Sequence, residues 1–271
     1  MKEIDVINQT PSPISKHDLI RDLKALGLSS KDNIMIHVSM SKIGWIIGGE
    51  VTLLQALQSF FHEGTIVMVT QTGDLSDPRN WENPPVPSSW MNTIIEEMPA
   101  YDKHLTPPNR LGRLPRLFYN ANDVFRSDHP MDSFAAWGKR AKDVTSYCDY
   151  HCAFGDKSPI QYMIDHDFKM LMVGTSYDTA TVLHYAETKV KHPPRMKQLL
   201  FIKDEVGQRQ VLEVEDIDYD TIYFNEIGQD YEKHHHIQKG FIGQAESKVV
   251  DVKSLVQHGI TYLRNKEHQN A

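Results

Sequence analysis

His184 and Glu187 are the two residues whose types and spacing best fit catalysis. Positions i and i+3 lie on one face of a helix, so the carboxylate can reach an imidazole nitrogen. Such a carboxylate fixes the tautomer of the ring and raises its basicity, which favours a general base at His184. A partly exposed histidine beside a solvated glutamate has the same spacing, so the surrounding segment must decide.

The segment VGTSYDTATVLHYAE leads into this pair. A buried strand over 169–173 precedes a turn of small residues, and a helix is expected over 179–189. Because sites in open α/β sheets gather at the carboxyl ends of strands, we expect Thr175, Ser176 and Asp178 beside the pair. There they would contact substrate, and one hydroxyl could stabilise an oxyanion. N-capping of the helix also accounts for these residue types.

The segment HVSMSKIGWIIGG, which begins at His37, has a related arrangement. His37 lies in an expected strand, and Ser39, Ser41 and several glycines follow before a helix. A glycine turn at a helix N-terminus offers backbone N–H groups to an anion, which suggests a phosphate-containing cofactor. Plain strand-to-helix connections have a similar composition.

Other catalytic and metal motifs find little support. The sequence contains no G-x-G-x-x-G, no P-loop and no G-x-S-x-G. The metal-ligand candidates are Cys148, His151 and Cys152, and the run His234, His235 and His236. The cysteines lack a second pair, and consecutive histidines point in different directions. We therefore expect no metal.

Apolar periodicity indicates the elements that must position these residues. Ser15 to Asp18 resembles a capping box for a helix that ends at Gly27. Strands over 33–38 and 65–70 flank a helix over 50–61, a βαβ order that predicts parallel neighbours and a right-handed crossover.

The rest of the chain is less regular. Residues 71–116 form a long loop rich in Pro, Asn and Asp, with a short helix over 88–97. Alternating segments such as QLLFIK and QRQVLEVE follow residue 194, and a last helix is expected over 252–264. The fold class predicted is a single α/β domain over 1–271, with a central mixed sheet flanked by helices, long functional loops and a small antiparallel C-terminal region.

Composition narrows the class of protein. The 271 residues are 40% hydrophobic and 24% charged, which is typical of globular proteins. The net charge of -7 argues against nucleic acid and suits a cationic ligand. Two cysteines, no signal-peptide pattern and no long apolar run lead us to expect a cytoplasmic protein without membrane association. A homodimer is a reasonable expectation.

Taken together, several segments resemble the aminoglycoside 3-N-acetyltransferase family. They are HVSMSKIGWIIGG, TQTGDLSDPRNWENPPVPSSW, SFAAWG, KSPI and VGTSYDTATVLHYAE, in that order. The similarity runs from about Leu19 to His192 and continues more loosely to the C-terminus. The resemblance implies acetyl-CoA as donor, an aminoglycoside amino group as acceptor, and a single α/β domain.

The resemblance also implies roles for matching positions. The pair aligns with the family's catalytic residues, Asp178 with an acidic position near the substrate, and four residues with the region that holds the CoA arm: His37, Ser39, Ser41 and Arg113. We expect CoA between the 37–49 turn and the 106–113 loop, so Thr106 is a further candidate contact. That loop reads TPPNRLGR, whereas the family usually has a pattern like T-P-T-R-G-M-G-R.

The predicted function is direct acetyl transfer, with His184 as base and Glu187 orienting its ring. An acyl-CoA N-acyltransferase for a different amine is an alternative, because the 106–113 loop departs from the family pattern. A non-catalytic CoA-binding protein is a second alternative, which the intact pair disfavours. A metal hydrolase fits the sequence less well than either.

Overall fold

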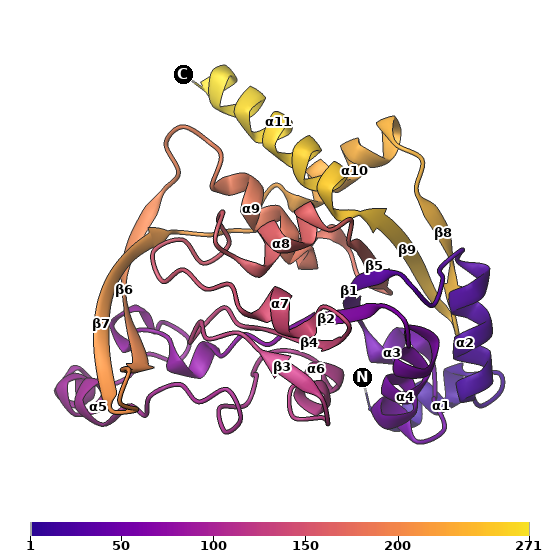
Figure 1. Ribbon diagram of the computed structural model, residues 1–271, viewed down its shortest axis with the longest axis horizontal. Helices are drawn as coiled ribbons and strands as arrows, with labels where there is room; N and C mark the ends of the chain where they lie inside the picture. The colour runs from indigo at the N-terminus through magenta and orange to yellow at the C-terminus, as the bar shows by residue number, and fades with distance from the viewer. Residues whose placement is uncertain (1, 271) are drawn as a thin grey trace.

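The computed structural model describes residues 2–270 and has the α/β class that the sequence predicts (Figure 1). A mixed sheet has the strand order β3-β4-β2-β1-β5-β9-β8, and a separate hairpin pairs β6 with β7. The strands of the main sheet are β1 (Asn33–Val38), β2 (Thr65–Val69), β3 (Val124–Arg126), β4 (Phe134–Gly138), β5 (Lys169–Val173), β8 (Gln238–Ile242) and β9 (Ala245–Asp251). The hairpin strands are β6 (Arg195–Lys203) and β7 (Arg209–Ile217).

Helices cover both faces of the main sheet. They are α1 (Glu3–Gln9), α2 (Lys16–Ala25), α3 (Met40–Ile43), α4 (Gly49–Phe60), α5 (Met91–Glu97), α6 (Arg113–Phe118), α7 (Ala141–Thr145), α8 (Pro159–Asp165), α9 (His184–Glu187), α10 (Phe224–His234) and α11 (Val252–Asn270). None of the helices in residues 2–270 is long and apolar enough to cross a membrane.

Three central strands run parallel, and this fixes where a site can form. β1 pairs in parallel with β2 on one side and with β5 on the other, while β4 and β9 pair antiparallel at the flanks. The expected βαβ unit of β1, α4 and β2 is therefore confirmed. Because the three carboxyl ends lie at one edge, the loops that follow β1, β2 and β5 meet there.

Side chains of the buried strands alternate between two cores. Ile34, Ile36 and Leu171 belong to the core shared with α2, α4 and α6. Met35 and Met170 face the opposite core, shared with α7, α8, α9, α10 and α11. Burial on both faces explains why these strands are continuous apolar runs.

Most of the predicted elements are present with small shifts at their ends. Ser15 caps α2 through a capping box with Asp18, as the motif predicts. The short helix near 88–97 and the strand over 169–173 are also confirmed. The last helix continues to Asn270, beyond the expected end at residue 264.

The continuous helix expected over 179–189 is wrong. Residues Tyr177–Thr179 and Thr181–Leu183 form separate 3-10 turns, and one α-helical turn, α9, follows. Ala180, between the two 3-10 turns, has φ of -77° and ψ of 73°, which is not helical and interrupts the hydrogen-bond ladder. Burial of Tyr177, Val182 and Leu183 decides the path of this segment, since tertiary packing overrides helix propensity.

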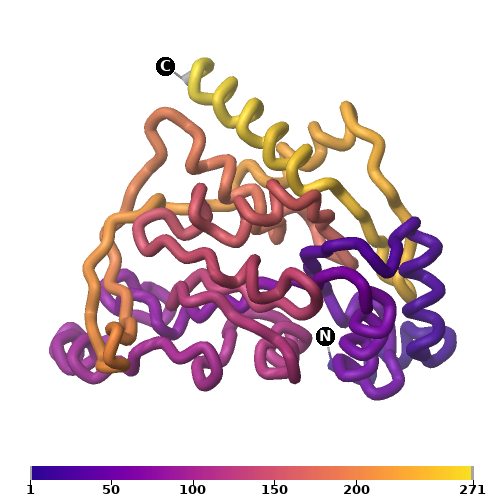
Figure 2. The backbone as a smooth tube through the Cα atoms, viewed as in Figure 1, coloured from indigo at the N-terminus to yellow at the C-terminus, as the bar shows by residue number. Residues whose placement is uncertain are grey.

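The β6–β7 hairpin is the small antiparallel region that the alternating pattern predicts, and it lies beside the long 71–116 loop (Figure 2). The N–H of Tyr101 donates to the Phe201 carbonyl at 2.8 Å. Buried Asp77 accepts from the N–H of Leu199 at 2.9 Å and pairs with Arg79 at 2.6 Å. These contacts hold the loop against β6, so the loop is ordered despite its lack of regular structure.

Candidate active site

The pair His184 and Glu187 makes the contact that the spacing predicts. The Nδ1 atom of His184 lies 2.6 Å from Oε2 of Glu187, and both side chains are largely buried. The second oxygen, Oε1, accepts from the N–H of Asp220 at 3.1 Å. A carboxylate that only accepts requires the proton to be on Nδ1, which leaves Nε2 as the basic nitrogen of the ring.

Three aromatic rings surround the imidazole of His184. Phe154 is stacked on it, with ring centroids 4.8 Å apart and planes at 17°. Tyr219 approaches edge-on at 5.4 Å, and Phe224, the first residue of α10, is tilted at 4.8 Å. These contacts restrict rotation of the ring, so the orientation of Nε2 is set by packing as well as by Glu187.

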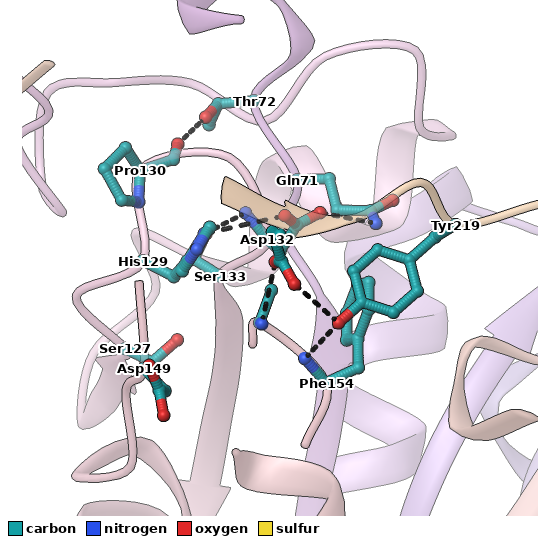
Figure 3. A network of polar contacts seen from close by, with 12 residues as sticks. Gln71, Thr72, Ser127, His129, Pro130, Asp132, Ser133, Asp149, Phe154 and Tyr219 are labelled. Carbon is teal, nitrogen blue, oxygen red and sulfur yellow. Dashed lines mark hydrogen bonds and ion pairs between the residues drawn. The ribbon is translucent and has the colours of Figure 1, made fainter. Parts of the chain in front are cut away.

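A buried polar network supports this aromatic wall (Figure 3). The Tyr219 hydroxyl donates to Asp216 at 3.1 Å and accepts from the N–H of Phe154 at 3.4 Å. Asp216 also accepts from the N–H of Ala153 at 3.0 Å. Burial raises the pKa of both Asp216 and Tyr219. One carboxylate thus fixes two of the rings that contact His184.

Further polar groups extend from this wall toward the loop after β2. The Gln71 amide donates to Asp132 at 3.2 Å, and the N–H of Asp132 donates to Nδ1 of His129 at 2.9 Å (Figure 3). Burial lowers the pKa of His129, while Asp132, Asp216 and Asp149 act in the opposite direction through their charge. The neighbourhood of the wall is therefore acidic.

The turn after β5 places its polar residues less favourably than expected. Asp178 is exposed and accepts a hydrogen bond from the Ser176 hydroxyl, so these two side chains engage each other. The Thr175 hydroxyl is buried and finds no hydrogen-bond partner within residues 2–270. Hydrogen bonds to His184 or Glu187 from these three side chains do not occur in the described part of the chain.

A groove of about 740 Å³ opens where the chain leaves β1. Ser39, Ser41 and Trp45 line one side of it, and Gly112 and Arg113 line another. Gly48 adopts φ of 76°, a left-handed conformation that favours glycine, and this turn brings α4 to the groove. The expected cleft between the 37–49 turn and the 106–113 loop is present.

Two of the expected groove residues lie elsewhere. His37 is buried within β1, and its Nε2 has no hydrogen-bond partner in the range 2–270. Burial lowers the pKa of His37 to about 4, so its ring is neutral at pH 7. The Thr106 hydroxyl accepts from the N–H of Asp102, and its carbonyl accepts from buried Arg126 at 2.6 Å. Strand alternation and this hydrogen bonding keep both away from the groove lining.

The groove and the His184 segment begin at neighbouring points of the sheet edge. The N–H of Ser39 donates to the Val173 carbonyl at 2.9 Å. Gly174 has φ of 64°, and a Cβ there would lie 2.9 Å from Cβ of Lys42 in α3. This close approach requires glycine and holds the turn after β5 against the turn after β1.

Sequence reasoning missed several residues that build the site. The residues that it missed come from a loop, the end of β7, the loop that follows β7, and α10, and none belongs to a motif: Phe154, Asp216, Tyr219 and Phe224. A single buried acid near the end of a strand, such as Asp216, carries no periodic signal. Only the convergence of these segments makes them neighbours of His184.

Similarity to known proteins shows which family this site belongs to. The family model for aminoglycoside 3-N-acetyltransferase matches residues 35–264. The chain belongs to that family. The match spans both the groove and the His184 segment, so the acetyltransferase family that the sequence resembles is confirmed.

Relatives of this acetyltransferase family cover nearly the whole chain. YokD of Bacillus subtilis (strain 168), a prophage-derived aminoglycoside N(3')-acetyltransferase-like protein, is 34% identical over 98% of each chain. Its crystal structure matches with a TM-score of 0.96 at 33% identity, covering 99% of this chain and 100% of the other. AAC-IIIb, solved with CoASH, matches with a TM-score of 0.82 at 26% identity over 94% and 98% of the two chains. AAC-VIa, solved with sisomicin, has the same TM-score and identity over 94% and 99%.

Two residues of the 106–113 loop differ from the family pattern, and the structure shows the conformation of one and the contact of the other. Arg110 stands where the pattern has glycine, and its φ of 55° is in the left-handed region. Asn109 stands where the pattern has arginine, and its side chain accepts from the N–H of Gly73 at 2.7 Å. The chain thus keeps a glycine-like backbone here at the cost of local strain, while Asn109 ties the loop to the one after β2.

Proposed function

We propose that this protein transfers the acetyl group of acetyl-CoA to the 3-amino group of an aminoglycoside by direct attack. The observation that supports this most strongly is the contact of His184 with Glu187 inside an aromatic wall, beside a groove at the same sheet edge. A positioned base and a groove that opens at the same sheet edge are what amine acylation by a thioester needs.

In the proposed reaction, Nε2 of His184 takes a proton from the acceptor ammonium group. The freed amine attacks the thioester carbonyl, and a tetrahedral oxyanion forms. When the C–S bond breaks, the imidazolium returns its proton to the thiolate and the attacking nitrogen releases its second proton to solvent, so the products are the amide, free CoA thiol and one proton. Glu187 keeps the proton of Nδ1 in place and stabilises the imidazolium.

An oxyanion needs a hydrogen-bond donor close to the thioester. Among the expected hydroxyls, we favour Thr175 over Ser176, because the Ser176 hydroxyl is already engaged by Asp178. A backbone N–H in the turns after β1 and β5 is the other candidate. Asp178 is proposed as an outer contact of the acceptor, since its carboxylate is exposed on the segment that leads to His184.

The groove is proposed to hold the CoA arm, with Ser39 and Ser41 along one wall and Arg113 at the other. Arg113→Ala should weaken acetyl-CoA binding about 10-fold, because a charge-assisted hydrogen bond to phosphate contributes about 1.5–3 kcal/mol and part of it is replaced by water. Calorimetric titration measures this. Arg116→Ala is the matched control, since Arg116 is exposed on the same helix and does not line the groove. Equal affinities for the two variants would contradict this placement.

The acceptor is proposed to be polycationic. The net charge is -7, Asp178 is exposed on the segment that leads to His184, and Asp132 and Asp149 are partly exposed near His129. Affinity for an aminoglycoside such as sisomicin should fall as salt rises from 0.05 to about 0.5 M, because exposed charge pairs are screened over about 10 Å at 0.1 M. Equilibrium titration at a series of salt concentrations checks this, with acetyl-CoA affinity measured in parallel. An affinity for sisomicin that is flat with salt would contradict recognition by carboxylates.

A different amine acceptor is the second candidate, and the altered loop at Asn109 and Arg110 favours it. A panel of aminoglycosides and simpler amines, followed by release of free CoA thiol, separates the two. Turnover restricted to simple amines would replace the aminoglycoside assignment. Absence of turnover with every amine, together with tight CoA binding, would favour a non-catalytic CoA-binding protein.

A further inference from the structure

Three metal-ligating side chains meet between α10 and α11, away from the proposed catalytic pair. Within residues 2–270, one ligand atom from each of Asp230, His234 and His258 lies within 4.8 Å of the others. Oδ2 of Asp230 is 3.1 Å from Nε2 of His258 and 3.8 Å from Nδ1 of His234. Asp230 and His234 are one turn apart on α10, while His258 comes from α11.

The run His234, His235 and His236 is not a metal-binding motif by itself, but the tertiary structure brings further ligands to one of these histidines. His234, His235 and His236 do point in different directions: the ring of His235 stacks on Tyr231, with centroids 4.2 Å apart. Only His234 is directed toward Asp230, and α11 then places His258 beside both. The cysteine cluster gains no such partner, since no metal-ligand group in the range 2–270 includes Cys148, His151 or Cys152.

The chemistry of the three groups suits a transition-metal ion. Two imidazoles and one carboxylate are a common donor set for Zn²⁺, and imidazole favours zinc, copper and nickel over magnesium or calcium. Nε2 of His258 and Nδ1 of His234 both face Oδ2 of Asp230, so the three ligand atoms converge on one position between the helices.

We propose that Asp230, His234 and His258 bind one divalent transition-metal ion of the zinc class, with water completing the coordination. Tetrahedral zinc with bonds of about 2.0–2.1 Å separates its ligand atoms by roughly 3.3 Å, so small side-chain rotations close the cluster. His234 must release the Asp230 carbonyl, which its Nδ1 contacts at 2.9 Å. Asp230 is half-buried near the end of α10, where water can take the place of the ring.

The ion joins two helices that cover the proposed active site. Phe224, which contacts His184, begins α10 and lies six residues before Asp230, about 9 Å along the helix axis. The ion is therefore too far along the helix to take part in the reaction. Its effect is to hold α10 against α11 and so to stabilise the aromatic wall.

The test is titration of tag-free, chelator-treated protein with Zn²⁺. Calorimetry should give one equivalent of bound ion, and the melting temperature should rise by about 5–10 °C at a free Zn²⁺ concentration of 100 Kd. His234→Ala and His258→Ala should each weaken binding at least 10-fold, and Asp230→Asn should weaken it without a change of shape. Co²⁺ provides a second readout, because its visible absorption reports binding at the same groups.

His236→Ala is the matched control, because it removes an adjacent histidine outside the cluster and should leave Zn²⁺ affinity unchanged. Circular dichroism of His258→Ala without metal tests whether this variant is folded. If His258→Ala does not fold, Asp230→Asn tests the site in its place. Loss of binding in His236→Ala with retention in His258→Ala would show that the histidine run alone holds the ion and would overturn the proposal. Absence of stoichiometric binding by the unsubstituted protein would overturn it too.

Discussion

His184→Ala should lower turnover by about 10²–10⁴-fold while acetyl-CoA still binds. The substitution removes the nitrogen that takes the proton, and a positioned general base contributes a factor of this size. Steady-state release of CoA thiol with one good acceptor measures turnover. Titration with acetyl-CoA establishes that the fold and the groove are intact.

His166→Ala is the matched control for this experiment. His166 is also stacked on an aromatic ring, that of Tyr162, with centroids 3.9 Å apart, but its Nδ1 contacts a backbone carbonyl instead of a carboxylate. Its loss should leave turnover nearly unchanged. A His184→Ala enzyme with near-normal turnover at neutral pH would rule out the proposed mechanism.

Substitution of Glu187 tests whether this residue and His184 act on the same step. Glu187→Gln keeps a hydrogen-bond partner for the ring but loses the charge that favours the imidazolium, so its loss of turnover should be smaller than that of His184→Ala. Because both residues serve one proton transfer, the double variant should be hardly slower than His184→Ala. Independent, multiplicative losses would indicate that the two side chains do not act together.

Gly228→Ala should lower the free energy of unfolding by about 2 kcal/mol. A Cβ at Gly228 in α10 would lie 2.0 Å from the ring of buried Tyr177, at a point where the ring packs directly on the helix backbone. Forcing atoms into a packed core costs about 1–3 kcal/mol, and this overlap places the cost at the upper end. Alanine regains only about 1 kcal/mol of helix propensity, so the clash decides the sign.

The expected fall in melting temperature is about 4–8 °C. Gly112→Ala is the control, because nothing lies within 4 Å of a Cβ there and its φ of -61° suits alanine. That variant should unfold within about 0.5 kcal/mol of the original protein. In a Tyr177→Ala background most of the Gly228→Ala penalty should disappear, since the two residues are in contact. An equal loss in both backgrounds would mean that the ring is not the cause.

The sequence alone predicted the elements whose signals are local. β1, β2, β5, α2 and the hairpin are recognisable from apolar runs, alternation and the cap at Ser15, because these patterns depend on near neighbours in the chain. The contact between His184 and Glu187 was also predictable, since one helical turn suffices to bring them together. The division of the segment 179–189 into shorter turns was not predictable, because it depends on the packing of Tyr177 and Leu183 against distant parts of the chain.

Only the tertiary structure decided which distant residues join the candidate site. Phe154, Asp216 and Phe224 surround His184 because three separate segments converge on one sheet edge, and no spacing along the chain encodes that convergence. The same reason applies to His258, which makes a cluster of Asp230 and His234. It also explains why His37 and Thr106 do not line the groove: strand alternation buries the first, and hydrogen bonds from the Asp102 N–H and from Arg126 hold the second. Local patterns thus determined the elements and the pair, while long-range packing determined the wall, the groove and the cluster.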